Sequence, residues 1–201
     1  MRASLIILGF FCVGLASGYL EWLPESWTRT DFSLYALYLL MFLVGISIGA
    51  DARVLLALRS HGLKLALVPL VTIFGTFTGI LAVSMLSGNI PVTEGLAVGA
   101  GFGYYSLSSV IISELYSETL GVVALLSNIM REVMTLLFAP LMVAAFGKLA
   151  PIASAGATSM DTTLPIITAS AGKEFAIVAL FHGIVLTILV PVLVTLIISL
   201  A

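Results

Sequence analysis

Two adjacent charges, Arg131 and Glu132, stand inside an apolar stretch of this sequence and are the first candidates for chemistry. The residues at 119–130 and 133–147, on either side of them, are all uncharged. A charge at the centre of a membrane helix costs about 2.5–3.5 kcal/mol on insertion scales, so it is retained for a partner or a function. In a helix, the spacing i, i+3, i+4, i+7 puts four polar residues on one face: Asn128, Arg131, Glu132 and Thr135. The sequence therefore predicts a polar face that is turned away from lipid.

Arg131 and Glu132 are expected to have different partners. Side chains one residue apart on a helix diverge by about 100°, so they pair poorly with each other. Three interpretations stay open: a structural ion pair with another span, a functional site, or a position near the membrane surface, since the stretch is long enough to place the pair off centre. Buried ion pairs rarely add stability over apolar packing, which favours the functional site.

Asp161 is the second candidate. It lies among hydroxyl side chains, namely Thr158, Ser159, Thr162 and Thr163. It is either a helix cap or a site for a cation or a proton, and a cap alone could be Ser or Thr at a lower insertion cost. His182, in the apolar run "ALFHGIVL", either bonds a backbone carbonyl or belongs to the same site.

The composition indicates a membrane protein. Of the 201 residues, 61% are apolar and 9% are charged, whereas soluble domains are about a quarter charged. The net charge of −2 provides no basic surface for nucleic acid. A single cysteine, Cys12, excludes an internal disulfide. The sequence has no motif for ATP phosphates, metal ligation or a serine nucleophile elbow, so we expect neither an enzyme nor a cofactor.

Hydropathy predicts an all-α membrane bundle. A span needs about 20 mainly apolar residues, and about seven stretches qualify: 3–20, 32–50, 65–87, 95–113, 119–147, 151–171 and 175–201. We expect one transmembrane domain over 1–201, with a three-span unit in 1–87 and a core with the polar site in 95–201. The first stretch could instead be a signal peptide, because Arg2, an apolar core and small residues fit that pattern.

Lysine and arginine predict the orientation in the cell membrane. The segment 51–64 contains Arg53, Arg59 and Lys64, so it should face the cytoplasm. Arg2 places the N-terminus on the same side, and seven spans then leave the C-terminus outside.

Close helix packing or a subunit interface is expected where glycines recur at a spacing of four: Gly14/Gly18, Gly45/Gly49 and Gly75/Gly79.

Two of the spans are predicted to be discontinuous. The first, 95–113, combines closely spaced glycines with polar residues that include Tyr105, Ser106 and Ser108; the second, around 156–165, contains Asp161 and Pro165. Each glycine weakens a helix by roughly 1 kcal/mol relative to alanine. Interrupted helices at membrane depth are the usual position of a transporter binding site. Long loops outside the membrane are the alternative for both segments.

Five segments resemble one known family. They are "LMFLVGISIGAD" (40–51), "GAGFGYYSLSSVIISEL" (99–115), "LSNIMREVM" (126–134), "GATSMDTTLPII" (156–167) and "HGIVLTILVPVL" (182–193). Together they are similar to the lysine exporter LysO family, also called DUF340, over nearly the whole chain. The resemblance implies export of L-lysine and of its toxic analogue thialysine in exchange for protons. It implies a function for Glu132 and places Asp161 in the family signature.

The resemblance also implies a homodimer. Longer family members begin with additional spans that resemble 3–87, and this chain lacks them, so we expect a second copy to complete the path. Each charged group of lysine would then bind a protein group of opposite charge. Arg131 or the N–H groups of a half-helix would bind its carboxylate, and Glu132 and Asp161 its ammonium groups, with H⁺, or alternatively Na⁺, as the coupling ion. The predicted binding site consists of Glu132, Asp161, Arg131, Asn128, Tyr105, Ser106, Ser108, Thr158, Ser159, Thr162 and His182.

Other functions stay open from the residues alone. An ion-coupled carrier for another cationic or small amino acid is the main alternative. A channel or scaffold would need no titrating acid, and its flux would follow voltage without proton coupling. An intramembrane hydrolase would need a serine whose loss abolishes activity while Glu132 is dispensable.

Overall fold

The computed structural model describes residues 65–88 and 91–201, together with nine single residues: Val13, Ala16, Ser17, Tyr19, Leu20, Tyr35, Leu39, Phe42 and Ile46. By its internal contacts the chain divides into two compact units, Met1–Leu39 and Leu40–Ala201. Every helix described below belongs to the second unit. The predicted spans 3–20 and 32–50, the basic segment 51–64, the signal-peptide alternative and the first two glycine pairs lie outside the described residues.

Three helices of the described part are long and apolar enough to cross a membrane. They are α5 (Leu67–Ser87), α8 (Glu118–Phe146) and α11 (Ala176–Ile198), the last extended by a short 3₁₀ turn, η3 (Lys173–Phe175). The outer faces of α5 and α8 expose many large apolar side chains, which a lipid environment tolerates and water does not. The described residues contain no strand. The prediction of an all-α membrane bundle is therefore confirmed.

The two remaining stretches are interrupted, as predicted. The first consists of α6 (Val92–Gly99) and α7 (Tyr105–Leu115). The second consists of α9 (Ala150–Ala155), the 3₁₀ helix η2 (Gly156–Met160) and α10 (Leu164–Ala171). Pro165 lies in the first turn of α10, where its missing N–H breaks no helical hydrogen bond.

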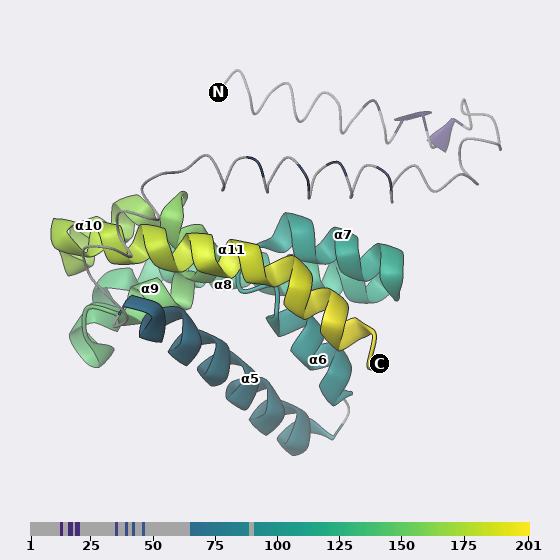
Figure 1. Ribbon diagram of the computed structural model, residues 1–201, viewed down its shortest axis with the longest axis horizontal. Helices are drawn as coiled ribbons and strands as arrows, with labels where there is room; N and C mark the ends of the chain where they lie inside the picture. Colours follow the sequence, from purple (N-terminus) through teal and green to yellow (C-terminus); the bar gives the residue numbers. More distant parts are fainter. Residues whose placement is uncertain are drawn as a thin grey trace. The chain divides into compact units, whose positions relative to one another are not determined.

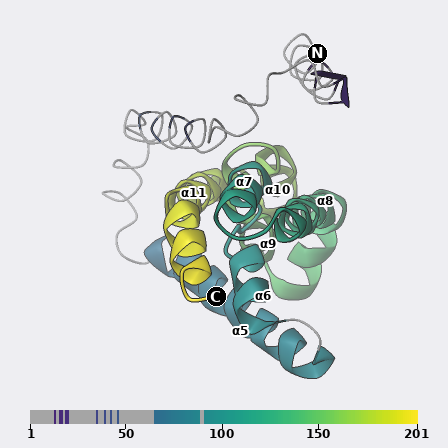
Figure 2. The ribbon, with the colours of Figure 1, turned by 90° about the vertical axis from the view of Figure 1, so that its right-hand side faces the viewer.

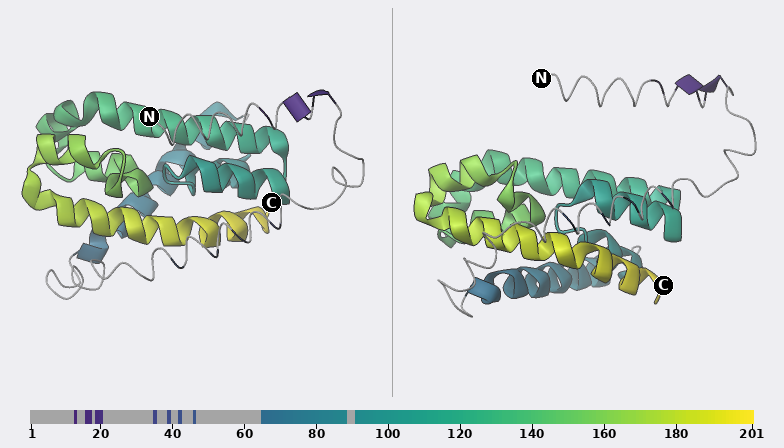
Figure 3. Two further views of the ribbon diagram at one scale, coloured as in Figure 1. Left: turned by 90° about the horizontal axis from the view of Figure 1, so that it is seen from above. Right: turned by 45° about the horizontal axis from the view of Figure 1, so that its top comes forward.

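The interrupted segments lie between the long helices. Viewed from above, α8 and α11 run along the two sides of the bundle, and α7 and the α9–η2 segment occupy the space between them (Figure 3). α5 crosses beneath and contacts α6, α9 and α11 (Figures 1 and 2). A small apolar core joins the pieces where α9, α10 and α11 meet, formed by Ile152, Ala155, Ile167 and Ala179. Long helices thus hold two helix breaks in the middle of the bundle.

The third glycine pair does not mediate helix packing within the described part. A Cβ atom added at Gly75 or Gly79 would meet nothing within 4 Å. Both glycines line an open groove of about 610 Å³ between α5, α6 and α8. Within the described helices, therefore, nothing packs closely against this pair, and the alternative of a subunit interface stays a prediction.

Candidate functional site

The first helix break, residues 100–104, is held by the side chain of Asn128. Its Oδ1 accepts a hydrogen bond from the backbone N–H of Gly103 at 2.7 Å, and its Nδ2 donates to Val98 O at 3.1 Å and to Ala124 O at 2.9 Å. Asn128 is buried. The amide therefore replaces the helical hydrogen bonds that the break removes, and all three of its bonds are to backbone atoms. It was expected in the binding site, but it lies outside the cavity and supports the break.

We expect Asn128→Leu to destabilise this break. Leucine would leave the Gly103 N–H buried without an acceptor, at a cost of about 1–3 kcal/mol. Thermal unfolding of the detergent-solubilised protein should show a lower midpoint, and the Gly103 amide should exchange hydrogen faster. Ser127→Ala, at the exposed neighbouring position, is the matched control and should change neither measurement. An unchanged rate of hydrogen exchange at the Gly103 amide in Asn128→Leu would contradict the role of Asn128 in holding the break.

The second break, around η2, is held by hydroxyl groups and by His182. Ser159 Oγ lies 2.7 Å from Gly156 O and 2.8 Å from Ala179 O, and Thr163 Oγ1 donates to Thr158 O at 2.9 Å. His182 Nε2 lies 2.9 Å from Thr72 Oγ1, and its Nδ1 lies 3.2 Å from Gly156 O. These buried groups connect η2 to α11 and α5. Ser159 and His182, both expected to bind substrate, are instead committed to holding the break.

The two breaks touch each other through their backbones. The Ala157 N–H donates to Phe102 O at 2.8 Å. A Cβ atom on Gly156 would overlap that same carbonyl oxygen, and one on Gly103 would lie 2.8 Å from Ala155 O. Phe102 itself has φ +42°, which is rare for a bulky residue and stores backbone strain. Glycine at 103 and 156 therefore permits a contact between breaks that any side chain would prevent.

Arg131 supports the second break rather than the cavity. Its Nε donates to Ser154 O at 2.7 Å and its Nη2 to Ala153 O at 2.9 Å. These are carbonyls at the C-terminal end of α9, which lack helical partners, and a cation is favourable there. The guanidinium also lies 5.9 Å from the centre of the Phe102 ring. Arg131 is thus directed at backbone carbonyls and does not line the cavity, which corrects its expected placement beside a bound carboxylate.

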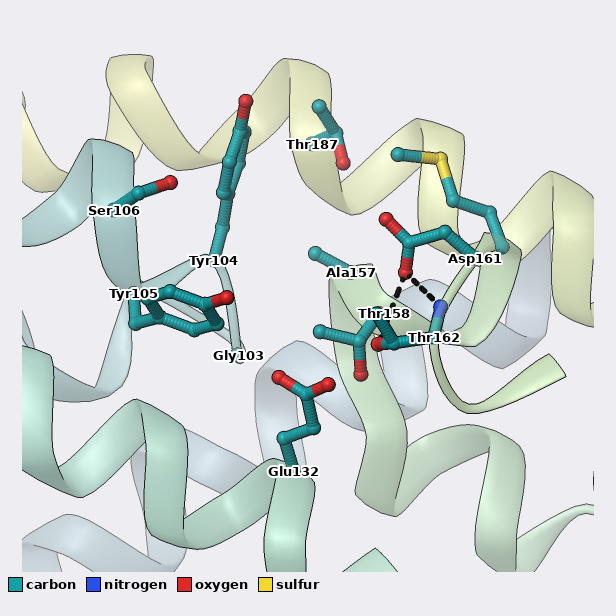
Figure 4. A pocket seen from close by; sticks show the side chains of 11 residues that line it. Gly103, Tyr104, Tyr105, Ser106, Glu132, Ala157, Thr158, Asp161, Thr162 and Thr187 are labelled. Atoms are coloured by element: carbon teal, nitrogen blue, oxygen red, sulfur yellow. Dashed lines mark hydrogen bonds between the residues drawn. The ribbon is translucent and has the colours of Figure 1, made fainter. Parts of the chain in front are cut away.

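Glu132, the next residue, points the other way, into a cavity of about 210 Å³ where the two breaks meet. Asp161 lines the same cavity from the second break (Figure 4). One of its oxygens, Oδ1, accepts from the Thr162 N–H at 2.6 Å and from Thr162 Oγ1 at 3.3 Å. Within the described part of the chain, neither carboxylate forms an ion pair. The structure therefore brings together two acids that are 29 positions apart in the sequence (161 − 132).

The opposite wall of the cavity is the N-terminal end of α7. Tyr105 and Ser106, the first two residues of that helix, line it, and no side chain caps the helix at Tyr104. The first N–H groups of a helix have no helical partners and carry a partial positive charge. The cavity therefore combines one wall that attracts an anion with two carboxylates that attract a cation.

The predicted site residues divide into two groups. Six line the cavity: Glu132, Asp161, Tyr105, Ser106, Thr158 and Thr162. Five do not: Arg131, Asn128, Ser108, Ser159 and His182. Ser108 turns back onto its own helix, where its Oγ donates to Tyr104 O at 2.9 Å. All five lie directly behind the cavity wall and form hydrogen bonds to the backbone of the breaks.

Sequence reasoning missed five lining residues: Gly103, Tyr104, Ala157, Met160 and Thr187. Four of them belong to the breaks themselves, and their neighbours were proposed. Thr187 is different, because it comes from the middle of the apolar helix α11. A weak signal was present: Gly183 precedes Thr187 by four residues, so the two share a face of the helix, and Gly183 packs closely against Met160.

Comparison with known proteins identifies the family of this chain. The family model of the lysine exporter LysO matches residues 8–198. The chain belongs to the lysine exporter LysO family. It is 32% identical over 193 residues to the lysine exporter LysO of Escherichia coli K12, covering 95% of this chain and 62% of that protein. It is 33% identical over 192 residues to a provisionally named lysine exporter of Haemophilus influenzae, covering 93% of this chain and 94% of that protein. No solved structure matches the chain.

The cavity of this LysO-family chain is suited to a small charged solute. Its volume of about 210 Å³ is below the roughly 300–1,000 Å³ of pockets for drug-sized ligands. Among the residues that the structure describes, no group of three or more His, Cys, Asp and Glu side chains could hold a metal ion. The described walls combine two carboxylates with the N-terminal end of a helix.

Proposed function

We propose that this protein exports L-lysine in exchange for protons, and that the cavity at the two helix breaks binds both. The observation that carries the proposal is that Glu132 and Asp161 face one cavity without a cationic partner among the described residues. Lysine has one carboxylate and two ammonium groups. The N–H groups at the start of α7 would bind the carboxylate, and the two acids would bind the ammonium groups.

Proton exchange follows from the membrane potential. Moving one net positive charge to the positive side costs about 2.3 kcal/mol per 100 mV, so a passive pore would admit lysine instead of releasing it. Exchange of one lysine for one proton moves no net charge. The cavity would open alternately to the two sides, and a carboxylate that binds either a proton or an ammonium group would supply the exchange. Glu132 is the first choice for that role because it lies between the breaks, whereas Asp161 is exposed.

The test is lysine efflux from proteoliposomes that are loaded with L-lysine. With an acidic exterior, efflux should accelerate, and a pH difference of one unit should sustain a roughly tenfold lysine gradient, since the exchange is one for one. An imposed voltage should have little effect. Flux that follows voltage and ignores the pH gradient would indicate a channel. An imposed sodium gradient, with the pH held equal, tests Na⁺ as the coupling ion.

The same assay separates lysine from related substrates. Thialysine, ornithine and arginine are added in turn as competitors. Stronger competition by ornithine or arginine than by unlabelled lysine would indicate a carrier for another cationic amino acid. The homodimer expected from the sequence stays a prediction, and light scattering of the purified protein in detergent tests it.

A further inference from the structure

The Thr187 hydroxyl is an exception among the buried threonines of these helices. A helical threonine usually donates its hydroxyl proton to the carbonyl four residues earlier. Thr72, Thr135 and Thr168 all do so, at 3.0, 3.0 and 2.9 Å. Thr187 lies in α11 and is 2% exposed, and its Oγ1 has no hydrogen-bond partner in the described part of the chain. A buried hydroxyl without a partner destabilises a fold, and valine would fill the same space without that cost.

The position of the Thr187 hydroxyl indicates its role. One other buried hydroxyl of the described residues, that of Ser84, also has no partner, and it lines the separate apolar groove beside α5. Thr187 instead lines the cavity that contains both acids. Its hydroxyl oxygen is on the side of the residue that faces Asp161 (Figure 4). The unpartnered atom therefore lies at the wall of the cavity, on the side of Asp161.

The chemistry of the cavity identifies the class of ligand. Two carboxylates attract a cation, and a primary ammonium group has three N–H donors that require separate acceptors. Thr162 occupies Oδ1 of Asp161, which leaves Oδ2 for a ligand. A second, neutral acceptor beside that oxygen would satisfy another ammonium proton without adding charge.

We propose that Thr187 binds an ammonium group of the transported amino acid together with Asp161. This proposal rests on the proposed function, and it adds a binding residue from α11 to a site otherwise formed by the two breaks and α8. The hydroxyl has no partner among the described residues because its partner is the substrate. Thr187 therefore destabilises the unloaded protein slightly and stabilises the loaded one.

Thr187→Val tests this assignment, because it removes the hydroxyl and preserves the shape of the side chain. Without lysine, its thermal unfolding midpoint in detergent should equal or exceed that of the wild type. The stabilisation that added L-lysine gives to the wild type should be largely lost, and the KM for lysine efflux should rise about tenfold with little change in maximal rate. Thr187→Ser should restore the wild-type KM. Thr195→Val, at an exposed position of the same helix, should behave like the wild type.

Three outcomes overturn the proposal. If Thr187→Val keeps the wild-type KM and the wild-type stabilisation by lysine, Thr187 does not contact the substrate, and the proposed function stands without it. If Thr187→Val unfolds at a clearly lower temperature without lysine, the hydroxyl has a structural partner. If the wild type itself neither transports lysine nor is stabilised by it, the proposed function fails, and this inference fails with it.

Discussion

Glu132→Gln is expected to reduce proton-coupled lysine efflux by on the order of 100-fold while the protein still folds. Glutamine has nearly the same shape but can neither release a proton nor carry a negative charge. Two unit charges about 4 Å apart attract each other by about 4 kcal/mol at an effective dielectric constant near 20. Loss of half of that attraction is already more than a tenfold loss of binding. Any residual efflux should also no longer respond to the pH gradient, since the exchanging group is gone.

The measurement is efflux from lysine-loaded proteoliposomes under an acidic exterior, with the amount of reconstituted protein checked. Glu114→Gln is the matched control, because Glu114 is exposed near the end of α7 and does not line the cavity. It should transport like the wild type. Folding of Glu132→Gln should be preserved, because Glu132 forms no hydrogen bond with another described residue in its present position. Full proton-coupled efflux by Glu132→Gln would exclude Glu132 as the exchanging group.

Gly156→Ala is expected to be the most damaging substitution for stability. Gly156 has φ +65° and ψ −128°, a conformation that residues with a side chain rarely adopt and that costs them on the order of 1–3 kcal/mol. The added methyl group would also overlap the carbonyl oxygen of Phe102. That oxygen belongs to the backbone of the other break and cannot rotate away. The contact between the breaks must therefore separate, with loss of the hydrogen bond from the Ala157 N–H and of the cavity wall.

Thermal unfolding in detergent measures this effect. A loss of several kcal/mol corresponds to a midpoint lowered by roughly 10 °C for a chain of this size, at about 2–4 °C per kcal/mol. Gly75→Ala is the matched control, since its methyl group would meet nothing within 4 Å and alanine favours a helix over glycine by about 1 kcal/mol. It should leave the midpoint unchanged or raise it. A Gly156→Ala protein as stable as the wild type would show that the two breaks do not need their close contact.

Local sequence signals predicted the breaks because the causes are local. Glycine and proline disfavour a continuous helix in any protein. Gly156 and Pro165 have this effect in the second break, and the glycines at 99–103 have it in the first. That Arg131 and Glu132 have different surroundings also followed from helix geometry alone, because neighbouring side chains on a helix diverge by about 100°. These features depend on residues that are neighbours in the chain.

The partners of Arg131 and Asn128 could not be predicted, because most of them are backbone atoms of distant segments. For His182, a bond to a backbone carbonyl was one of the two alternatives, but neither Gly156 O nor Thr72 Oγ1 could be identified from the sequence. A polar side chain in an apolar span indicates that it has a hydrogen-bond partner. The sequence does not distinguish a substrate from a carbonyl of an unwound segment as that partner, because both form hydrogen bonds with the same side chains. The role of Thr187 was missed for the opposite reason. A lone hydroxyl in an apolar helix usually bonds its own backbone, and only the three-dimensional position of Thr187 reveals that it does not.

The contact between Phe102 and Ala157 has a consequence for movement. A hydrogen bond of 2.8 Å and two glycine-permitted approaches join the interrupted helices at their centres, and Arg131 and Asn128 connect each of them to α8. A hinge between the two interrupted helices would have to break all of these connections at once. If the cavity opens alternately to the two sides of the membrane, both interrupted helices and α8 should therefore move together as one body.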